Sequence, residues 1–240
     1  MTEQSSTADS QSPALQVVKA VNEVRKYILG LILSVTAVTA GLYFLAPEIL
    51  RFFQNHLNQE LAFFTVAEPF LAHVKLSLIT AVFILMPGIV YCLWKAAAKP
   101  FKMSSATLTW FVLFTCILFY SGAFFCYSIT LPFGVSFLLE FQSTELKPII
   151  SIGKFVTFVA VFILAFGIIF ELPIIMVFTA RAGLISRDTF QKNRRYAVLA
   201  ISIVAALLTP TPDVVNMLLM GVPLYLLYEF GIIVIRLLKI

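Results

Sequence analysis

The chain has few charged residues and almost none of the residues that build metal or catalytic centres. Charged side chains make up 12% of the 240 residues, against 60% hydrophobic ones. No soluble domain of this length needs so much apolar surface, so the composition excludes a soluble globular protein and indicates one that crosses a membrane several times. The two histidines and three cysteines have neither the spacing of a zinc site nor that of a disulfide framework, so we expect no metal and no cofactor.

Enzymatic motifs are also missing. The sequence contains no G-x-S-x-G, H-E-x-x-H, P-loop or C-x-x-C pattern. An intramembrane protease or acyltransferase would need a buried Ser/His, Asp/Asp or metal set, and the apolar runs hold none. We therefore expect neither an enzyme nor a nucleic-acid-binding protein.

Long apolar runs predict an all-α integral membrane protein with six transmembrane helices. The runs cover residues 27–46, 72–94, 108–131, 155–180, 196–209 and 215–235. The fifth is short for a hydrocarbon core of about 30 Å, and the sixth is interrupted by Gly221 and Pro223. Residues 1–16 are polar and without apolar periodicity, which predicts a disordered cytoplasmic tail ahead of a membrane domain over 17–240.

The distribution of positive charge predicts the orientation. With the N-terminus in the cytoplasm, only Arg51, Lys75, Lys147 and Lys154 of the 17 lysines and arginines fall on the outer side. An even number of spans returns the C-terminus to the cytoplasm as well. Two sizeable outer loops remain, over 47–71 and 132–153, the second opening at Pro132, and together they suggest a cap on the outer face.

Glu171 is the one carboxylate deep inside an apolar run. It is about nine residues from the next charged segment, on the order of 13 Å along a helix, so its side chain cannot reach water. A carboxylate at that depth is costly and more often functional than decorative. Pro173 frees a backbone carbonyl nearby, which needs another partner. Glu171 therefore either makes a functional contact or forms a hydrogen bond that locks the helices together.

The remaining carboxylates have simpler interpretations. Glu23 can pair with Lys26 on an exposed helical turn, and Glu68, followed by Pro69, suits the start of a helix. Asp213 can cap the sixth helix. Glu229 is close to the cytoplasmic end of that helix, where Arg236 is a possible partner.

Several short motifs, in this order and spacing, resemble TatC, the core subunit of the twin-arginine protein translocase. They are Glu23-Val-Arg25, Glu68-Pro69-Phe70 with Lys75, Tyr91-Cys-Leu-Trp94, Phe166-Gly-Ile-Ile-Phe-Glu171-Leu-Pro173, Arg194-Arg195-Tyr196, Leu208-Thr-Pro-Thr-Pro212-Asp213 and Tyr228-Glu229. The resemblance implies six helices in a curved, glove-like arrangement with short fifth and sixth helices. It also implies a subunit of the bacterial inner membrane that receives folded proteins with twin-arginine signal peptides and helps move them across using the proton-motive force.

The resemblance assigns roles to individual residues. Glu23 and Arg25 match the signal-peptide-binding segment, and a carboxylate there suits an arginine pair because it offers bidentate hydrogen bonds. Glu171 and Pro173 match the family's contact with partner helices, where a polar side chain can hydrogen-bond the carboxylate. Glu68, Pro69 and Asp213 are expected as structural residues on the periplasmic side. The implied partners are TatA- and TatB-type single-span subunits in a hetero-oligomer, signal peptides and membrane lipids.

The first cytoplasmic loop departs from the family pattern. Ala96 replaces an aromatic residue, and the region of Ser105 replaces the second signal-binding carboxylate, while Lys95, Lys99 and Lys102 add positive charge. A divergent assembly scaffold with weak signal binding therefore stays open as an alternative. A proton-coupled transporter that uses Glu171 as its protonating group is a further alternative, but the repeat symmetry it predicts is not found.

Overall fold

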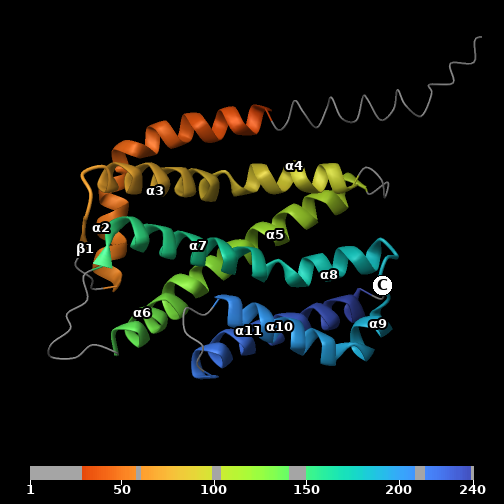
Figure 1. Cartoon of the computed structure of the whole chain (residues 1–240). Coiled ribbons are helices and arrows are strands. Elements are labelled where there is room, and N and C mark those ends of the chain that lie inside the picture. The colour runs from red at the N-terminus through yellow and green to blue at the C-terminus, as the bar shows by residue number, and fades with distance from the viewer. Residues whose placement is uncertain (1–28, 58–60, 99–103, 141–149, 209–213, 239–240) are drawn as a thin grey trace, which may run out of the picture.

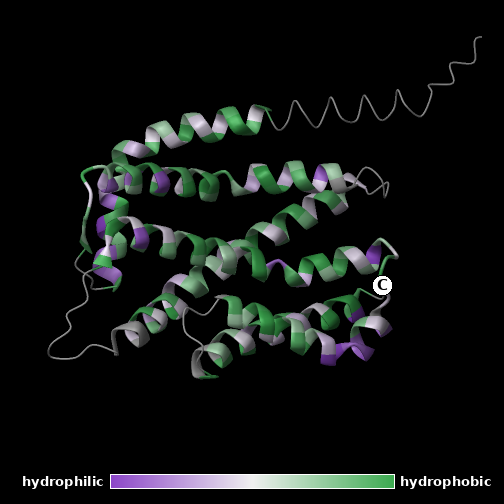
Figure 2. Cartoon of the chain, in the orientation of Figure 1, coloured by the Kyte–Doolittle hydropathy of each residue, from purple (hydrophilic) through white to green (hydrophobic). Residues whose placement is uncertain are grey.

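The structure is a computed structural model of the chain, and it describes residues 29–57, 61–98, 104–140, 150–208 and 214–238. Most of these residues are helical. Figure 1 shows the helices running alongside one another, with α2 and β1 at one end of the bundle and α9 at the other. We call these the strand end and the α9 end. Hydrophilic residues gather at the two ends, and the helices between them are largely hydrophobic (Figure 2).

The described part of the chain begins with a helix over 29–42, followed by a short 3-10 turn, η1 (Tyr43–Leu45), and by α2 (Ala46–Leu57). The first helix packs against little of the bundle, since Leu33 is 72% exposed and Phe44, in η1, is 83% exposed. In contrast, α2 buries Leu50 and Leu57 in the core and exposes its opposite face, as its amphipathic sequence predicts.

The second apolar run forms two helices, α3 (Glu68–Ile84) and α4 (Met86–Ala98), which meet at an angle of 56°. Pro87 explains the bend, because it has no N–H to donate to the carbonyl of Phe83 one turn earlier. That carbonyl instead accepts a hydrogen bond of 2.9 Å from the hydroxyl of Tyr120 on the next helix. A side chain of a neighbouring helix thus satisfies the freed backbone group, as an apolar environment requires.

The third run extends further than the sequence predicts. Helix α5 (Ser105–Phe125) continues through a π-helical turn, η2 (Cys126–Thr130), into α6 (Leu131–Glu140). The second outer loop was expected to open at Pro132, and this boundary is wrong. The π-helical turn lies one turn before Pro132, where its wider backbone can accommodate the proline ring without ending the helix.

The fourth run forms α7 (Ile152–Phe170) and α8 (Leu172–Arg181), which together make a stretch of 30 residues long and apolar enough to cross a membrane. Just before α7, β2 (Ile150–Ser151) pairs in parallel with β1 (Leu61–Ala62), with Leu61 opposite Ile150. The two loops that were expected to cap one face are therefore joined through their backbones.

The last part of the chain forms α9 (Arg187–Lys192), α10 (Arg194–Leu208) and α11 (Val214–Leu237). Helix α10 has 15 residues and is short, whereas α11 has 24 residues and continues through Gly221 and Pro223. The expectation of a short, interrupted sixth helix is therefore wrong. Helix α11 packs along α8 and α10 and buries Leu224 and Ile232, so tertiary contacts outweigh the one hydrogen bond that Pro223 removes.

Within the described ranges, four helical stretches are long and apolar enough to cross a membrane, and a fifth is added if the bent α3–α4 pair counts as one span. The architecture is thus that of a mostly helical integral membrane protein. Helix α10 is shorter than these stretches.

Candidate functional site

Glu171 lies at the junction of two helices. Helix α7 ends at Phe170, α8 begins at Leu172, and Pro173 is close enough to the start of α8 to be tolerated there. The N–H of Glu171 donates to the carbonyl of Ile168 at 3.1 Å, and its own carbonyl accepts from the N–H of Ile175 at 3.0 Å. These two hydrogen bonds connect α7 to α8 across the junction, and the local distortion caused by Pro173 does not interrupt the 30-residue span.

The side chain of Glu171 is in a different situation from its backbone. The residue is only 8% exposed, and neither carboxylate oxygen has a hydrogen-bond partner among the described residues. Leaving a buried polar group unpaired costs about 1–3 kcal/mol, and more for a charged group. The functional contact and the internal locking bond both stay predictions for this buried carboxylate, since the hydroxyl of Thr115 on α5 lies near it.

Two other helices place polar and aromatic side chains beside Glu171. The hydroxyl of Thr115, on α5, lies near the carboxylate and accepts a hydrogen bond of 2.9 Å from the indole N–H of Trp94, on α4. The indole ring packs against Phe111 and Phe178, with its centroid 4.9 Å from that of each ring, and the two phenylalanine rings also contact each other. An indole, a hydroxyl and a carboxylate from three helices therefore meet inside the bundle.

Trp94 could be identified from the sequence only through a family motif, and Thr115 could not be identified. The apolar run of 108–131 holds several hydroxyl side chains, and nothing in the sequence distinguishes Thr115 from the others. Whether that hydroxyl faces lipid, a helix or a carboxylate depends on how α5 packs, which the sequence pattern does not specify.

Close packing of α5 on α7 fixes this arrangement. A Cβ atom on Gly122 would come within 2.7 Å of the carbonyl oxygen of Phe166, and one on Gly167 within 2.5 Å of the Phe119 ring. Both positions require the absence of a side chain, as is common where membrane helices approach closely.

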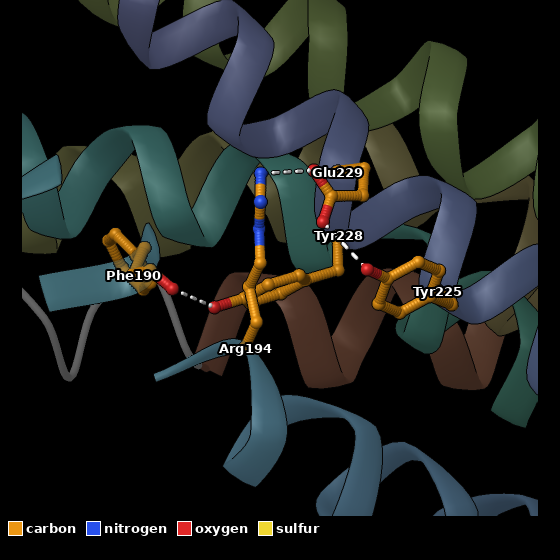
Figure 3. A network of polar contacts seen from close by, with 5 residues as sticks. All are labelled: Phe190, Arg194, Tyr225, Tyr228 and Glu229. Atoms are coloured by element: carbon orange, nitrogen blue, oxygen red, sulfur yellow. Dashed lines mark hydrogen bonds and ion pairs between the residues drawn. The ribbon is translucent and has the colours of Figure 1, made fainter. Parts of the chain in front are cut away.

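A second polar cluster lies at the α9 end (Figure 3). Arg194, at the start of α10, forms an ion pair of 2.9 Å with Glu229 on α11, and the hydroxyl of Tyr225 donates to the same carboxylate at 2.9 Å. The hydroxyl of Tyr228 donates to the carbonyl of Phe190 on α9 at 2.8 Å. The suggested partner of Glu229, Arg236, is replaced by Arg194. Arg236 is two helical turns away along α11, about 10 Å, whereas α10 begins beside Glu229.

At the strand end, Glu68 joins three elements. It is the first residue of α3, and Pro69 follows it. Its carboxylate accepts hydrogen bonds from the hydroxyl of Ser151, from the N–H of Gly153 at 3.1 Å and from the N–H of Phe64 at 2.8 Å. Glu68 therefore connects the loop after β1 and the start of α3 to the start of α7.

Comparison with known proteins assigns the family. Residues 19–223 match the family described as Sec-independent protein translocase protein (TatC). The chain belongs to the TatC family. It is 33% identical over 217 residues to the Sec-independent protein translocase protein TatC of Carboxydothermus hydrogenoformans. This alignment covers 87% of this chain and 89% of that protein. The corresponding protein of Helicobacter pylori strain J99 is 32% identical over 217 residues, covering 90% of this chain and 87% of the relative.

The fold agrees with this assignment. The crystal structure of the twin arginine translocase receptor TatC in DDM superposes with a TM-score of 0.76 at 27% sequence identity, covering 90% of this chain and 98% of that structure. The family and the mostly helical TatC fold that the sequence motifs imply are thus confirmed.

For this TatC-family chain, the predicted residues do not all fall in the described part. Glu171, Pro173, Glu68 and Pro69 are described, and the structure places the first pair far from the second along α7 and α3. Glu23, Arg25 and Asp213 lie outside the described residues, as does the loop segment 99–103. The signal-peptide site at Glu23 and Arg25 and the structural role of Asp213 stay predictions.

Proposed function

We propose that this chain is the receptor subunit of a twin-arginine translocase, and that Glu171 binds a polar side chain on the transmembrane helix of a TatA- or TatB-type subunit. The observation that supports the second part is the buried carboxylate, neither oxygen of which has a hydrogen-bond partner of ordinary geometry among the described residues. In an apolar environment such a group is stabilised by a donor from a neighbouring helix, with hydrogen bonds between membrane helices worth about 0.6 kcal/mol on average.

The surface beside Glu171 suits a docking helix. Ile168 and Ile175 lie three residues before and four residues after Glu171, so they share its helical face, and they are 61% and 51% exposed. An incoming helix could pack its apolar side chains on these two residues while one polar side chain reaches the carboxylate. Pro173 is buried next to them and shapes the backbone of the same junction.

Signal recognition belongs to a different part of the molecule. Glu23 and Arg25 would meet the arginine pair of a signal peptide at the cytoplasmic face, where two guanidinium groups can form charge-assisted hydrogen bonds with a carboxylate. Transport of the folded substrate across the bacterial inner membrane would draw on the proton-motive force, together with the partner subunits.

This function requires a six-span topology with both termini in the cytoplasm. The spans would be the helix from residue 29, the bent α3–α4 pair, α5–α6, α7–α8, α10 and α11. The 15 residues of α10 reach about 22 Å, less than an ordinary hydrocarbon core, so the bilayer would thin around it. The strand end would then be periplasmic and the α9 end cytoplasmic.

Complementation tests the proposal. A bacterial strain that lacks its own TatC subunit is given this chain, and export of a folded reporter with a twin-arginine signal is measured. We expect export with the wild type and with Glu48→Ala, which removes an exposed carboxylate on α2, but strongly reduced export and signal-peptide crosslinking with Glu23→Ala. Absence of export by wild-type chain that inserts normally would contradict the receptor function. It would favour the alternative of a divergent assembly scaffold with weak signal binding. That alternative is supported by the first cytoplasmic loop, which has three lysines and lacks the second signal-binding carboxylate.

A further inference from the structure

A groove near the strand end carries two lysines that the proposed function does not use. It has a volume of about 710 Å³ and lies between α3 and α7, with Leu207 of α10 at one side. Lys75 on α3 and Lys154 on α7 both line it, and both side chains are exposed. The groove is separate from Glu171, which is not among its lining residues.

Lys75 has an unusual position for a charged residue. It is seven residues after the start of α3, about 10 Å along the helix, inside a stretch that qualifies as part of a membrane span. Its ammonium group donates to the hydroxyl of Thr157 at a long 3.5 Å, and neither Lys75 nor Lys154 forms an ion pair with a described carboxylate. A lysine within a membrane span is expected to have a partner or to line a pathway.

Among the described residues, Glu68 is the one carboxylate that lines this groove, and its oxygens are already hydrogen-bonded. Glu68 accepts hydrogen bonds from Ser151, Gly153 and Phe64. Glu68 keeps its negative charge but forms no ion pair with Lys75 or Lys154, and one carboxylate cannot balance two ammonium groups. The lysines therefore leave the groove with a positive charge that an external anion can match.

The walls of the groove change character along α7. Lys154 and Thr157 lie in its first turns, and Phe158, Val161 and Phe162 follow on the same side toward the middle of the span. Positive charge at the rim and an apolar wall below it match an amphiphile with an anionic head. A free anion would use the rim alone, and an apolar peptide would leave the two ammonium groups unpaired.

We propose that this groove binds one anionic phospholipid, with its phosphate between Lys75 and Lys154 and an acyl chain along Phe158, Val161 and Phe162. In the proposed topology this is a lipid of the outer leaflet, held where α3, α7 and the end of α10 meet. The lipid would fill the space left beside α10, which is too short to span an undeformed bilayer.

Lipid binding to the purified full-length protein in detergent tests the site by native mass spectrometry. Three probes are titrated: phosphatidylglycerol, phosphatidylcholine with the same acyl chains, and glycerol phosphate. We expect one phosphatidylglycerol to bind wild-type protein, with the Lys75→Gln, Lys154→Gln double variant weaker by about tenfold or more because two cations near the headgroup are lost. Arg51→Gln removes an exposed cation of α2 that does not line the groove, and it should bind like wild type.

The acyl-chain part of the site has its own test. Val161→Trp fills the apolar wall while both lysines remain, and it should weaken phosphatidylglycerol binding; a series of phosphatidylglycerols with shorter chains should show the same loss on wild-type protein. Equal binding of phosphatidylglycerol by wild type and double variant, or equal binding of the two lipids, would overturn the proposal. Glycerol phosphate binding as tightly as phosphatidylglycerol would reduce the site to a free-anion site. Crosslinking of a signal peptide at position 75 without lipid binding would assign the groove to the substrate.

Discussion

Gly122 is the position where a single methyl group should do the most damage to the bundle. An added Cβ would lie 2.6 Å from the Cγ atom of Phe170 and 2.7 Å from the backbone oxygen of Phe166. The second distance is 0.7 Å short of the 3.4 Å at which ordinary contact begins, and a backbone oxygen cannot turn away as a flexible side chain can. Gly122→Ala must therefore push α5 away from α7. Overpacking of this kind costs about 1–3 kcal/mol.

Thermal unfolding in a mild detergent measures this cost. A loss of 1–3 kcal/mol corresponds to a Tm lower by about 3–10 °C for a chain of this length. Gly88→Ala, in α4, is the matched control because nothing lies within 4 Å of its added Cβ. This variant should keep or slightly raise the Tm, since alanine favours a helix over glycine by up to about 1 kcal/mol. If Gly122→Ala and Gly88→Ala unfold at the same temperature, the close packing of α5 on α7 is refuted.

Two further predictions concern polar pairs. Glu229→Gln and Arg194→Gln should each lower the free energy of unfolding by no more than about 1 kcal/mol, because the two side chains are 25% and 49% exposed. A double-mutant cycle of these two changes should show coupling, whereas Arg195→Gln combined with Glu229→Gln should show none. Additive effects of the two changes would exclude a contributing ion pair. Trp94→Phe keeps an aromatic ring against Phe111 and Phe178 but loses the hydrogen bond to Thr115, so it should cost about 1 kcal/mol beyond any change in packing. The cost should disappear in a Thr115→Val background, and a full cost in that background would show that the bond contributes nothing.

The sequence motifs were sufficient to identify the family and the mostly helical membrane fold. Apolar runs of this length locate helices well, because a helix that spans the membrane is the main way to remove such a long apolar segment from water. Glu171 could be identified for the same reason: one carboxylate in a run of 26 residues has no local route to water.

Proline positions show where this reasoning reaches its limit. Pro87 bends the second run by 56°, Pro132 does not end the third, and Pro223 does not interrupt the last. At Pro87, the hydroxyl of Tyr120 donates to the carbonyl that the proline leaves free. At Pro132, a π-helical turn accommodates the proline ring, and at Pro223, packing on α8 and α10 keeps the helix continuous. None of these is a local property of the sequence.

The partners of Glu171 and Glu229 on other helices could not be predicted from the sequence either. Thr115 reaches the site of Glu171, and Arg194 reaches Glu229, only because α5 and α10 are packed in a particular rotation and register. The spacing of residues along one helix predicts contacts within that helix, which is why Arg236 was the natural candidate for Glu229. Contacts between helices need the fold.

Copurification of the single-span partner with Glu171 variants tests the central claim most directly. If the carboxylate holds a partner helix by a hydrogen bond, Glu171→Gln should retain most of the partner, because an amide can replace the carboxylate in that bond, and Glu171→Ala should lose it. Glu48→Ala should behave as wild type. Equal retention of the partner by the glutamine and alanine variants would contradict the docking role of Glu171, and equal loss of export by both variants with the partner still bound would indicate that Glu171 carries protons instead.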